Sequence, residues 1–279
     1  MEKLIRIDII AAEDMVEIIS GALALYSSYG WEEESLPTGE TRFRVHCENA
    51  EYMDALMHGL EPYAAQVHIE RTEIDKQDWT SAWREFFTPV VCGHFVVLPP
   101  WRKDDAGENK AIVIEPKSAF GTGHHATTAL CLSVISRLIL QGRVAKGQRF
   151  LDLGTGSGVL SLGCCLEGMH GIATDIDLLA VENAQENRDL NNIEGLEILL
   201  GSTEVVRGQH FDLVVANILA RPLIELATDL VALKGEHGAL VLSGLLDVQA
   251  NSVVEAYTAL GLPQPERVLD GEWCALIWA

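Results

Sequence analysis

Three glycines alternate in the stretch Phe150–Gly158, which reads F-L-D-L-G-T-G-S-G. Gly154, Gly156 and Gly158 follow an apolar run that is typical of a buried strand. Because glycine carries no Cβ, the backbone can turn sharply there and a ligand can lie directly against it. The helical pattern that begins at Val159 would point free N–H groups back at this turn. The stretch therefore predicts a strand, a turn and a helix that together hold a nucleotide-like ligand.

The spacing of the glycines and the acid before them indicate the kind of ligand. A dinucleotide fingerprint reads G-x-G-x-x-G, whereas this turn reads G-x-G-x-G and follows Asp152. An acidic residue before the turn suits a ligand with a cationic group better than one with phosphates. S-adenosylmethionine carries an ammonium and a sulfonium and no phosphate. We therefore expect it to be the cofactor, with Asp152, Gly154, Gly156 and Gly158 at its binding site.

Two further polar residues end predicted strands. Asp175 closes the strand in A-T-D-I-D, where an acid can bond the ribose hydroxyls of a nucleotide. Its other interpretation is a helix N-cap, for which Asp177 is the better candidate. Asn217 ends the apolar strand D-L-V-V-A-N, so it should lie at the edge of the sheet where ligands bind. Its side-chain oxygen could accept a hydrogen bond from a substrate amine, or the residue could simply serve in a turn.

The segment Phe120–Thr128 reads F-G-T-G-H-H-A-T-T and precedes a helix that runs to about Leu140. His124 and His125 could be solvated, could hydrogen-bond a substrate, or could act as a base near neutral pH. Thr127 and Thr128 are candidates to cap the helix, and their hydroxyl groups could also reach the cofactor. His125 and Asn217 are thus the candidate catalytic residues.

The elements around these residues predict an α/β fold. After residue 150, short apolar runs alternate with amphipathic helical patterns, which is typical of a parallel, doubly wound sheet. The dipeptide Asp270-Gly271 between two apolar runs indicates a C-terminal hairpin with an antiparallel strand. Strands are predicted at 150–153, 170–174, 196–200, 211–216, 239–243, 266–270 and 273–278, and helices at 159–167, 178–191, 221–232 and 248–260.

The first part of the chain has a different pattern. Strand and helix signals follow one another as β-α-β-β-α-β over residues 4–73, which predicts a small α+β, ferredoxin-like domain. We place a linker with a helix at 74–88 and the catalytic domain at 89–279. Strands at Pro89–Pro100 and Lys110–Ile114, on either side of an exposed loop at Arg102–Asn109, are expected to form a small sheet attached to that domain.

Composition limits the possible partners. The formal net charge is −21 and the isoelectric point is about 4.7, which argues against direct binding of nucleic acid but allows attraction to a basic partner. The acidity could equally serve solubility alone. No apolar run reaches the ~18 residues of a membrane span, and charges interrupt the N-terminal apolar run. The cysteines lack zinc-site spacing, so we expect no metal. We also expect a monomeric protein in the cytoplasm.

Several motifs together resemble the ribosomal protein L11 methyltransferase family (PrmA). They are F-G-T-G-H-H-A-T-T, L-D-L-G-T-G-S-G, A-T-D-I-D and D-L-V-V-A-N-I-L-A-R-P, with D-W-T-S-A-W-R-E-F-F-T-P-V, L-S-G-L-L-D-V-Q-A and G-E-W-C-A-L around them in the family's order. The resemblance covers roughly residues 75–279. The family usually reads G-T-G-T-H-P-T-T in the loop, so His125 matches its His, while His124 and Ala126 depart from it.

The resemblance implies a class I methyltransferase that uses S-adenosylmethionine. It implies cofactor contacts at Thr128, Gly154, Asp175 and Asn217, each of which matches in its motif. It also implies that the N-terminal domain grips a basic substrate, ribosomal protein L11, and that the linker lets several amines, on lysines or at the N-terminus, reach one active site.

Three other functions compete with this one. The protein could methylate a lysine of a different protein, as the electron-transfer flavoprotein lysine methyltransferases with a related core do. A nicotinamide dehydrogenase is disfavoured by the glycine spacing. A non-catalytic binding module is disfavoured because Asp152, Asp175 and Asn217 are all present.

Overall fold

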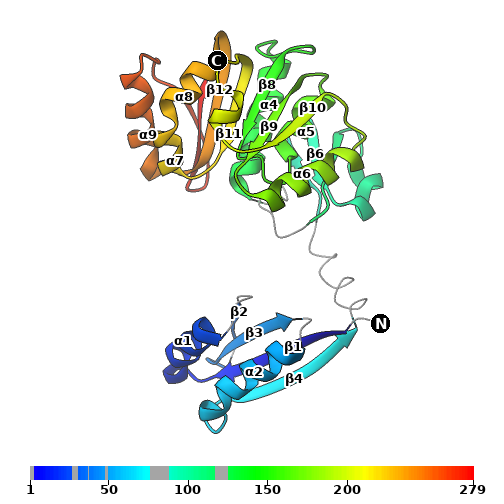
Figure 1. Cartoon of the computed structure of the whole chain (residues 1–279), viewed down its shortest axis with the longest axis vertical. Coiled ribbons are helices and arrows are strands. Elements are labelled where there is room, and N and C mark those ends of the chain that lie inside the picture. The colour runs from blue at the N-terminus through cyan, green and yellow to red at the C-terminus, as the bar shows by residue number, and fades with distance from the viewer. Residues whose placement is uncertain (1–2, 27–30, 37, 48–49, 76–87, 117–124) are drawn as a thin grey trace. The chain divides into compact units, whose positions relative to one another are not determined.

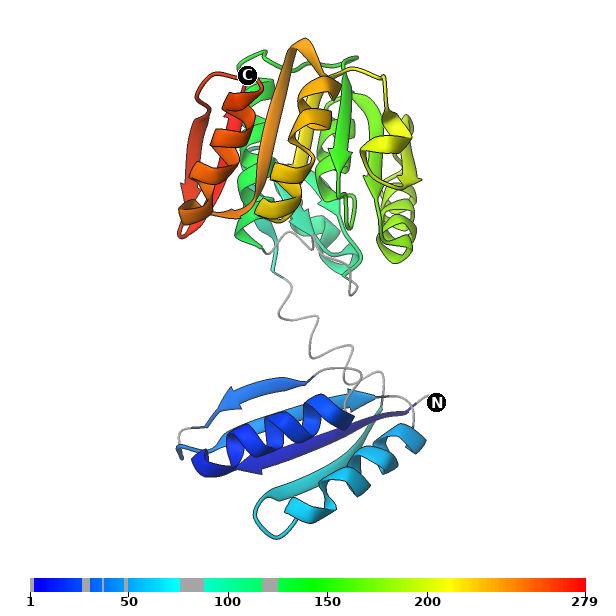
Figure 2. The same cartoon turned by 60° about the vertical axis from the view of Figure 1, so that its left-hand side comes forward.

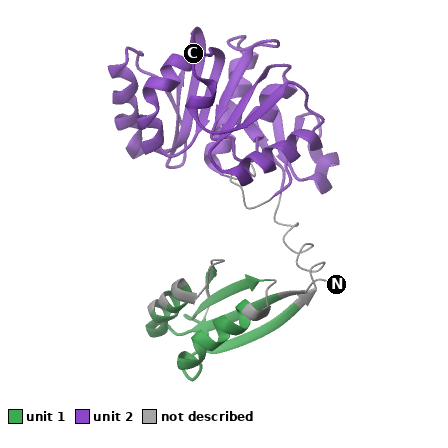
Figure 3. Cartoon of the chain, viewed as in Figure 1, with its two compact units in different colours: residues 1–87 green, residues 88–279 purple. Residues whose placement is uncertain are grey.

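The computed structural model describes residues 3–26, 31–36, 38–47, 50–75, 88–116 and 125–279. Contacts within the chain divide it into two units, residues 1–87 and 88–279 (Figure 3). Strand β4 (His68–Asp75) ends two residues past the expected end of the first domain at residue 73. The predicted linker helix falls on residues 76–87, which lie outside the described residues. The three-part division of the chain therefore stays a prediction.

A mixed sheet forms the centre of the second unit. Seven strands of its described residues pair in the order β10-β9-β8-β11-β12-β14-β13. The pairs from β10 to β12 are parallel, and β14 is antiparallel to both of its neighbours. This order confirms the predicted doubly wound α/β sheet with an antiparallel hairpin strand. The strands are β8 (Arg149–Leu153), β9 (His170–Asp175), β10 (Leu196–Leu200), β11 (Phe211–Asn217), β12 (Lys234–Leu246), β13 (Glu266–Asp270) and β14 (Trp273–Trp278).

Helices cover both faces of this sheet (Figure 1). In β11, Leu213 and Val215 belong to one hydrophobic core, whereas Val214 and Ala216 belong to the core on the opposite face. Both faces are buried, which explains why the strand is apolar throughout. The first core packs against α4 (Ala126–Leu140), α5 (Val159–Leu166) and α6 (Leu178–Leu190), and the second against α7 (Ala220–Glu225), α8 (Ala227–Leu233) and α9 (Asp247–Ala259). The 3-10 turn η4 (Thr203–Val206) follows β10.

The small sheet of the second unit differs from its prediction. The strand expected at Pro89–Pro100 is two antiparallel strands, β5 (Val90–Cys92) and β6 (Phe95–Leu98). Gly93 makes the turn between them with a φ of 63°, a conformation that favours glycine. Strand β7 (Lys110–Val113) pairs parallel with β6. Much of the expected loop is the 3-10 helix η3 (Pro100–Ala106).

In the first unit, four antiparallel strands pair in the order β2-β3-β1-β4 among the described residues. Among the described residues, helices α1 and α2 lie on one face of this sheet (Figure 2), where Ile7, Ile9 and Phe43 are fully buried. Asp8 belongs to the alternate set of positions in β1 and forms ion pairs with Arg6 and Arg44 at 2.6 and 2.8 Å. The elements are β1 (Lys3–Ala11), η1 (Glu13–Met15), α1 (Val16–Tyr26), β2 (Glu32–Ser35), β3 (Thr41–Cys47), α2 (Ala50–Leu60), η2 (Glu61–Tyr63) and β4 (His68–Asp75).

Across the described ranges, no helix combines the length and the apolar composition needed to cross a membrane.

Candidate functional site

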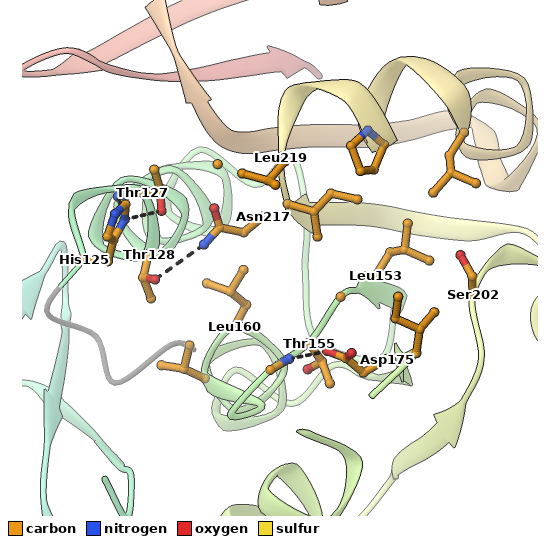
Figure 4. Close-up of a pocket in the computed structure, with 18 of the residues that line it drawn as sticks. His125, Thr127, Thr128, Leu153, Thr155, Leu160, Asp175, Ser202, Asn217 and Leu219 are labelled. Carbon is orange, nitrogen blue, oxygen red and sulfur yellow. Dashed lines mark hydrogen bonds between the residues drawn. The ribbon is translucent and has the colours of Figure 1, made fainter. Parts of the chain in front are cut away.

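A pocket of about 470 Å³ opens at the edge of the large sheet where the parallel strands end (Figure 4). Gly154 follows β8, Asp175 and Asn217 are the last residues of β9 and β11, and Gly201 follows β10. Ligands of open α/β sheets bind at this edge. The sheet thus brings together residues that lie far apart in the sequence.

The glycine turn forms the floor of the pocket. Gly154, Gly156 and Gly158 have φ values of 73°, 56° and 83°, in the region that L-residues with a Cβ rarely adopt. A Cβ on Gly154 would lie 2.4 Å from the Cγ2 atom of Ile218. Gly154 and Gly156 line the pocket, whereas Gly158 begins α5 and faces Ala184 of α6. Gly158 therefore lets α6 pack closely behind the turn.

Asp152 lies beneath the turn and outside the pocket wall. It is fully buried, and its Oδ2 atom accepts hydrogen bonds from the hydroxyl groups of Thr155 and Ser161, both at 2.7 Å, and from the Ser161 N–H at 3.2 Å. Burial raises the pKa of Asp152, and the hydrogen bonds from Ser161 and Thr155 oppose that rise. The carboxylate fixes the turn to the start of α5, and a direct contact with the cofactor stays a prediction.

Asp175 connects the turn to the next strand. Its Oδ2 atom accepts a hydrogen bond from the Gly156 N–H at 2.9 Å, and its Oδ1 atom accepts one from the Asp177 N–H at 3.0 Å. Asp177 is the residue that caps α6, through a 2.9 Å hydrogen bond from the Leu179 N–H. The Asp175 carboxylate is therefore available at the pocket wall (Figure 4).

Asn217 and Thr128 meet on the other side of the pocket. The Nδ2 group of Asn217 donates a hydrogen bond to the Thr128 hydroxyl at 3.4 Å. The Asn217 Oδ1 atom is buried and has no hydrogen-bond partner within the described residues. A buried acceptor without a partner is unfavourable, so the site is suited to a ligand that brings an N–H or O–H group.

His125 begins α4 and lines the pocket. Its Nδ1 atom accepts a hydrogen bond from the Thr127 N–H at 3.3 Å and lies 2.8 Å from the Thr127 hydroxyl. The helix cap is therefore His125, and the prediction that Thr127 or Thr128 caps this helix was wrong. The His125 ring makes an edge contact with Trp273, with ring centroids 4.6 Å apart. His124 lies outside the described residues.

Sequence reasoning missed part of the pocket wall. Gly201 and Ser202 directly follow a predicted strand, so the rule that selected Asp175 and Asn217 could have found them. Trp273 begins β14, and its pairing with Leu246 brings it to the same edge. The remaining wall that was not predicted is mainly apolar and comprises Leu153, Thr155, Val159, Leu160, Ile176, Ile218, Leu219, Pro222, Leu226 and Gly244.

The chemistry of the wall fits S-adenosylmethionine. Among the described residues that line the pocket there is no Lys or Arg, and Asp175 is an acidic group. A phosphate-rich nucleotide would lack a cationic partner there, whereas a ribose hydroxyl could donate to Asp175. The apolar side chains suit a purine ring, and Gly154 and Gly156 bring the backbone of the turn to the pocket wall.

Comparison with known proteins identifies the family. The family model for ribosomal protein L11 methyltransferase (PrmA) matches residues 11–279. Proteins named ribosomal protein L11 methyltransferase include one from Carboxydothermus hydrogenoformans, 35% identical over 210 residues that cover 74% of this chain and 67% of the relative. Another, from a Nitratiruptor species, is 35% identical over 228 residues that cover 81% of this chain and 77% of the relative.

Solved structures give the same result. A crystal structure of the ribosomal protein L11 methylase from Lactobacillus delbrueckii subsp. bulgaricus matches with a TM-score of 0.62 and 28% identity, over 68% of this chain and 97% of that one. A methyltransferase domain of METTL16 matches with a TM-score of 0.50 and 18% identity, over 64% of this chain and 91% of that one, and shares the fold alone. From its fold, its pocket and these relatives, the chain belongs to the ribosomal protein L11 methyltransferase (PrmA) family.

Proposed function

We propose that this protein transfers methyl groups from S-adenosylmethionine to amines of ribosomal protein L11, on lysine side chains, at the N-terminus, or both. The observation that carries the proposal is the buried, unpartnered Oδ1 atom of Asn217 at the pocket wall, within the part of the chain that the structure describes. When bound, S-adenosylmethionine supplies a methyl group made electrophilic by its sulfonium. The protein's own residues hold, orient and shield the two reactants.

The cofactor would be held on the side of the glycine turn. Gly154 and Gly156 line the pocket on that side, and Asp175 offers a carboxylate to ribose hydroxyls. Figure 4 shows Asp175 and Ser202 on one side of the pocket and His125 and Thr128 on the other. This separation supports a cofactor end and an acceptor end in one cavity.

The acceptor amine would bind where Asn217 faces the pocket. An amine attacks only when neutral, and the reference pKa values are about 10.4 for lysine and about 8 for an α-amino group. The apolar wall would lower either pKa, because desolvation disfavours the charged form. The Asn217 Oδ1 atom then accepts a hydrogen bond from an N–H of the amine and orients the lone pair of the amine nitrogen toward the methyl group. This orientation would supply most of the rate enhancement.

His125 would orient the acceptor rather than take its proton. The Thr127 N–H donates to the Nδ1 atom of His125, so the lone pair that would act as a base is already used. In the neutral ring, the proton then resides on Nε2. The proton of the methylated amine would leave to water.

The first domain, residues 1–73, would hold the ribosomal protein. The excess negative charge of the chain, −21 in total, suits a basic partner and would speed encounter at low salt. We further propose that the enzyme works in the cytoplasm, as a monomer and without direct contact with nucleic acid. Because the chain belongs to the ribosomal protein L11 methyltransferase family, methylation of a lysine on electron-transfer flavoprotein is not favoured.

The test is methyl transfer with labelled S-adenosylmethionine. Purified ribosomal protein L11, a second basic ribosomal protein and electron-transfer flavoprotein are incubated separately with the enzyme, and the labelled peptides are identified by mass. Label on L11 amines alone is expected. Label on the flavoprotein and none on L11 would refute the proposed substrate, and the second basic protein shows whether positive charge alone suffices.

A further inference from the structure

One buried side chain connects the glycine turn to a segment of the chain far from it in sequence. Asn187 on α6 is fully buried. Its Nδ2 group donates to the carbonyl of Ser157, inside the glycine turn, at 2.9 Å. Its Oδ1 atom accepts the Glu115 N–H, also at 2.9 Å. A single amide group thus joins two backbone positions.

The surroundings make this connection stiff. The second N–H of the Asn187 amide points to the Oδ1 atom of Asn183, one helical turn earlier, at 3.4 Å. Ala184 packs against the Gly158 end of the same turn. Water cannot replace the hydrogen bonds of a fully buried amide without opening the core. The hydrogen bonds of Asn187 therefore provide a direct connection between the Ser157 carbonyl and the Glu115 N–H.

A neighbouring asparagine holds the same segment without touching the turn. Asn191 ends α6; its Oδ1 atom accepts the Val113 N–H at 2.9 Å and its Nδ2 group donates to the Val113 carbonyl at 2.6 Å. Neither bond reaches the glycine turn. Asn191 therefore anchors the end of β7, and Asn187 alone of this pair connects the segment after β7, at Glu115, to the turn.

We propose that Asn187 is a positioning residue that couples occupancy of the glycine turn to the placement of Glu115. The assignment of the cofactor to this turn rests on the proposed function. A ligand bound against Gly154 and Gly156 restrains the turn, including the Ser157 carbonyl. The Asn187 amide, which donates to that carbonyl and accepts the Glu115 N–H, then restrains Glu115.

The test uses S-adenosylhomocysteine as the probe and measures hydrogen exchange of the Glu115 amide by NMR, with and without the probe. In the full-length wild type, saturation with the probe should slow this exchange by about tenfold, the effect of about 1.4 kcal/mol. In Asn187→Leu the slowing should fall below about twofold, and the dissociation constant of the probe should rise about tenfold, since a buried carbonyl has lost its donor.

Asn191→Leu is the matched control. It removes an amide from the same helix and the same segment, so exchange at Val113 should become faster. The response of Glu115 to the probe should remain within about twofold of wild type, as should the dissociation constant. A merely structural role of Asn187 would make the two variants alike in the response of Glu115.

Asn187→Asp covers the case in which the leucine variant does not fold. When ionised, the carboxylate still accepts the Glu115 N–H but cannot donate to Ser157, so the response should again be lost. An undiminished response in either Asn187 variant overturns the coupling, as does a wild-type Glu115 amide that ignores bound probe. A wild type that binds no probe overturns the proposed function as well.

Discussion

Replacing Gly154 by alanine should lower the free energy of unfolding and weaken ligand binding on the cofactor side of the pocket. The φ of 73° at this residue is left-handed, which costs an L-residue with a Cβ roughly 1–2 kcal/mol. The new Cβ would lie 2.4 Å from the Cγ2 atom of Ile218, far inside the ~3.5–4.0 Å of an ordinary carbon contact. Overpacking of this kind costs about 1–3 kcal/mol more.

Gly142→Ala separates the two costs. Gly142 has a similar φ of 68°, and a Cβ there would meet nothing within 4 Å, so this variant carries the backbone cost alone. The free energies of unfolding of the two variants, measured by thermal denaturation, should therefore differ by the cost of overpacking, about 1–3 kcal/mol. The dissociation constant of S-adenosylhomocysteine, measured by titration calorimetry, should rise at least about tenfold in Gly154→Ala and stay near wild type in Gly142→Ala.

A second variant identifies the clashing atom. Ile218→Ala removes the Cγ2 atom, so adding it to Gly154→Ala should restore part of the lost affinity and stability, as a double-mutant cycle measures. The reasoning would be refuted if Gly154→Ala bound the probe as tightly as Gly142→Ala. It would also be refuted if the alanine at 218 made the loss at 154 worse.

Four further outcomes are expected. Asn217→Ala should lower kcat for L11 methylation by about tenfold to a hundredfold, from the loss of a hydrogen bond worth about 1–3 kcal/mol; full activity with unchanged affinities would exclude its role. Asp175→Asn should weaken probe binding about tenfold or more, because an ionised acceptor is replaced by a neutral one, and its thermal midpoint should fall, because the Gly156 N–H or the Asp177 N–H loses its acceptor. Burial raises the folded-state pKa of Asp152, so the folded state holds the proton more tightly and the unfolding free energy of wild type should fall as pH rises from about 4 through the raised pKa. Asp152→Asn should lack this fall, so urea unfolding should show the variant gaining stability relative to wild type over that window. Association with L11 should slow as salt rises, because screening weakens attraction between opposite net charges; a rate independent of salt would exclude electrostatic steering.

The positions of the strand ends could be predicted because they depend on local pattern. An apolar run that stops at a polar residue locates the edge of a parallel sheet, and this placed Asp175 and Asn217 at the pocket. The Asp-Gly turn likewise gave the bounds of β13 and β14 without error. In each case one short segment contains all the information needed.

The remaining features depend on partners that lie far away in sequence. Gly93 interrupts an apolar run that otherwise resembles one strand. A Cβ at this position would lie only 2.2 Å from the Oγ atom of Ser136, so a partner 43 residues later in the sequence requires glycine there. His125 caps α4 although threonines are the commoner choice, because its ring also packs against Trp273. Asp152 precedes the glycine turn in sequence yet lies behind it in space, where Ser161 and Thr155 bind it.

The position of β14 has a consequence for how the protein comes to be folded during its synthesis. This strand is made after all the others in the sheet, yet it lies between β12 and β13. Among the described strands, β13 pairs with β14 alone, so it leaves the ribosome without a partner and must wait for the residues that follow it. Trp273 reaches the pocket only when β14 has paired with β12. Pairing of β14 with β12 therefore both provides β13 with its neighbour in the sheet and completes the wall of the pocket.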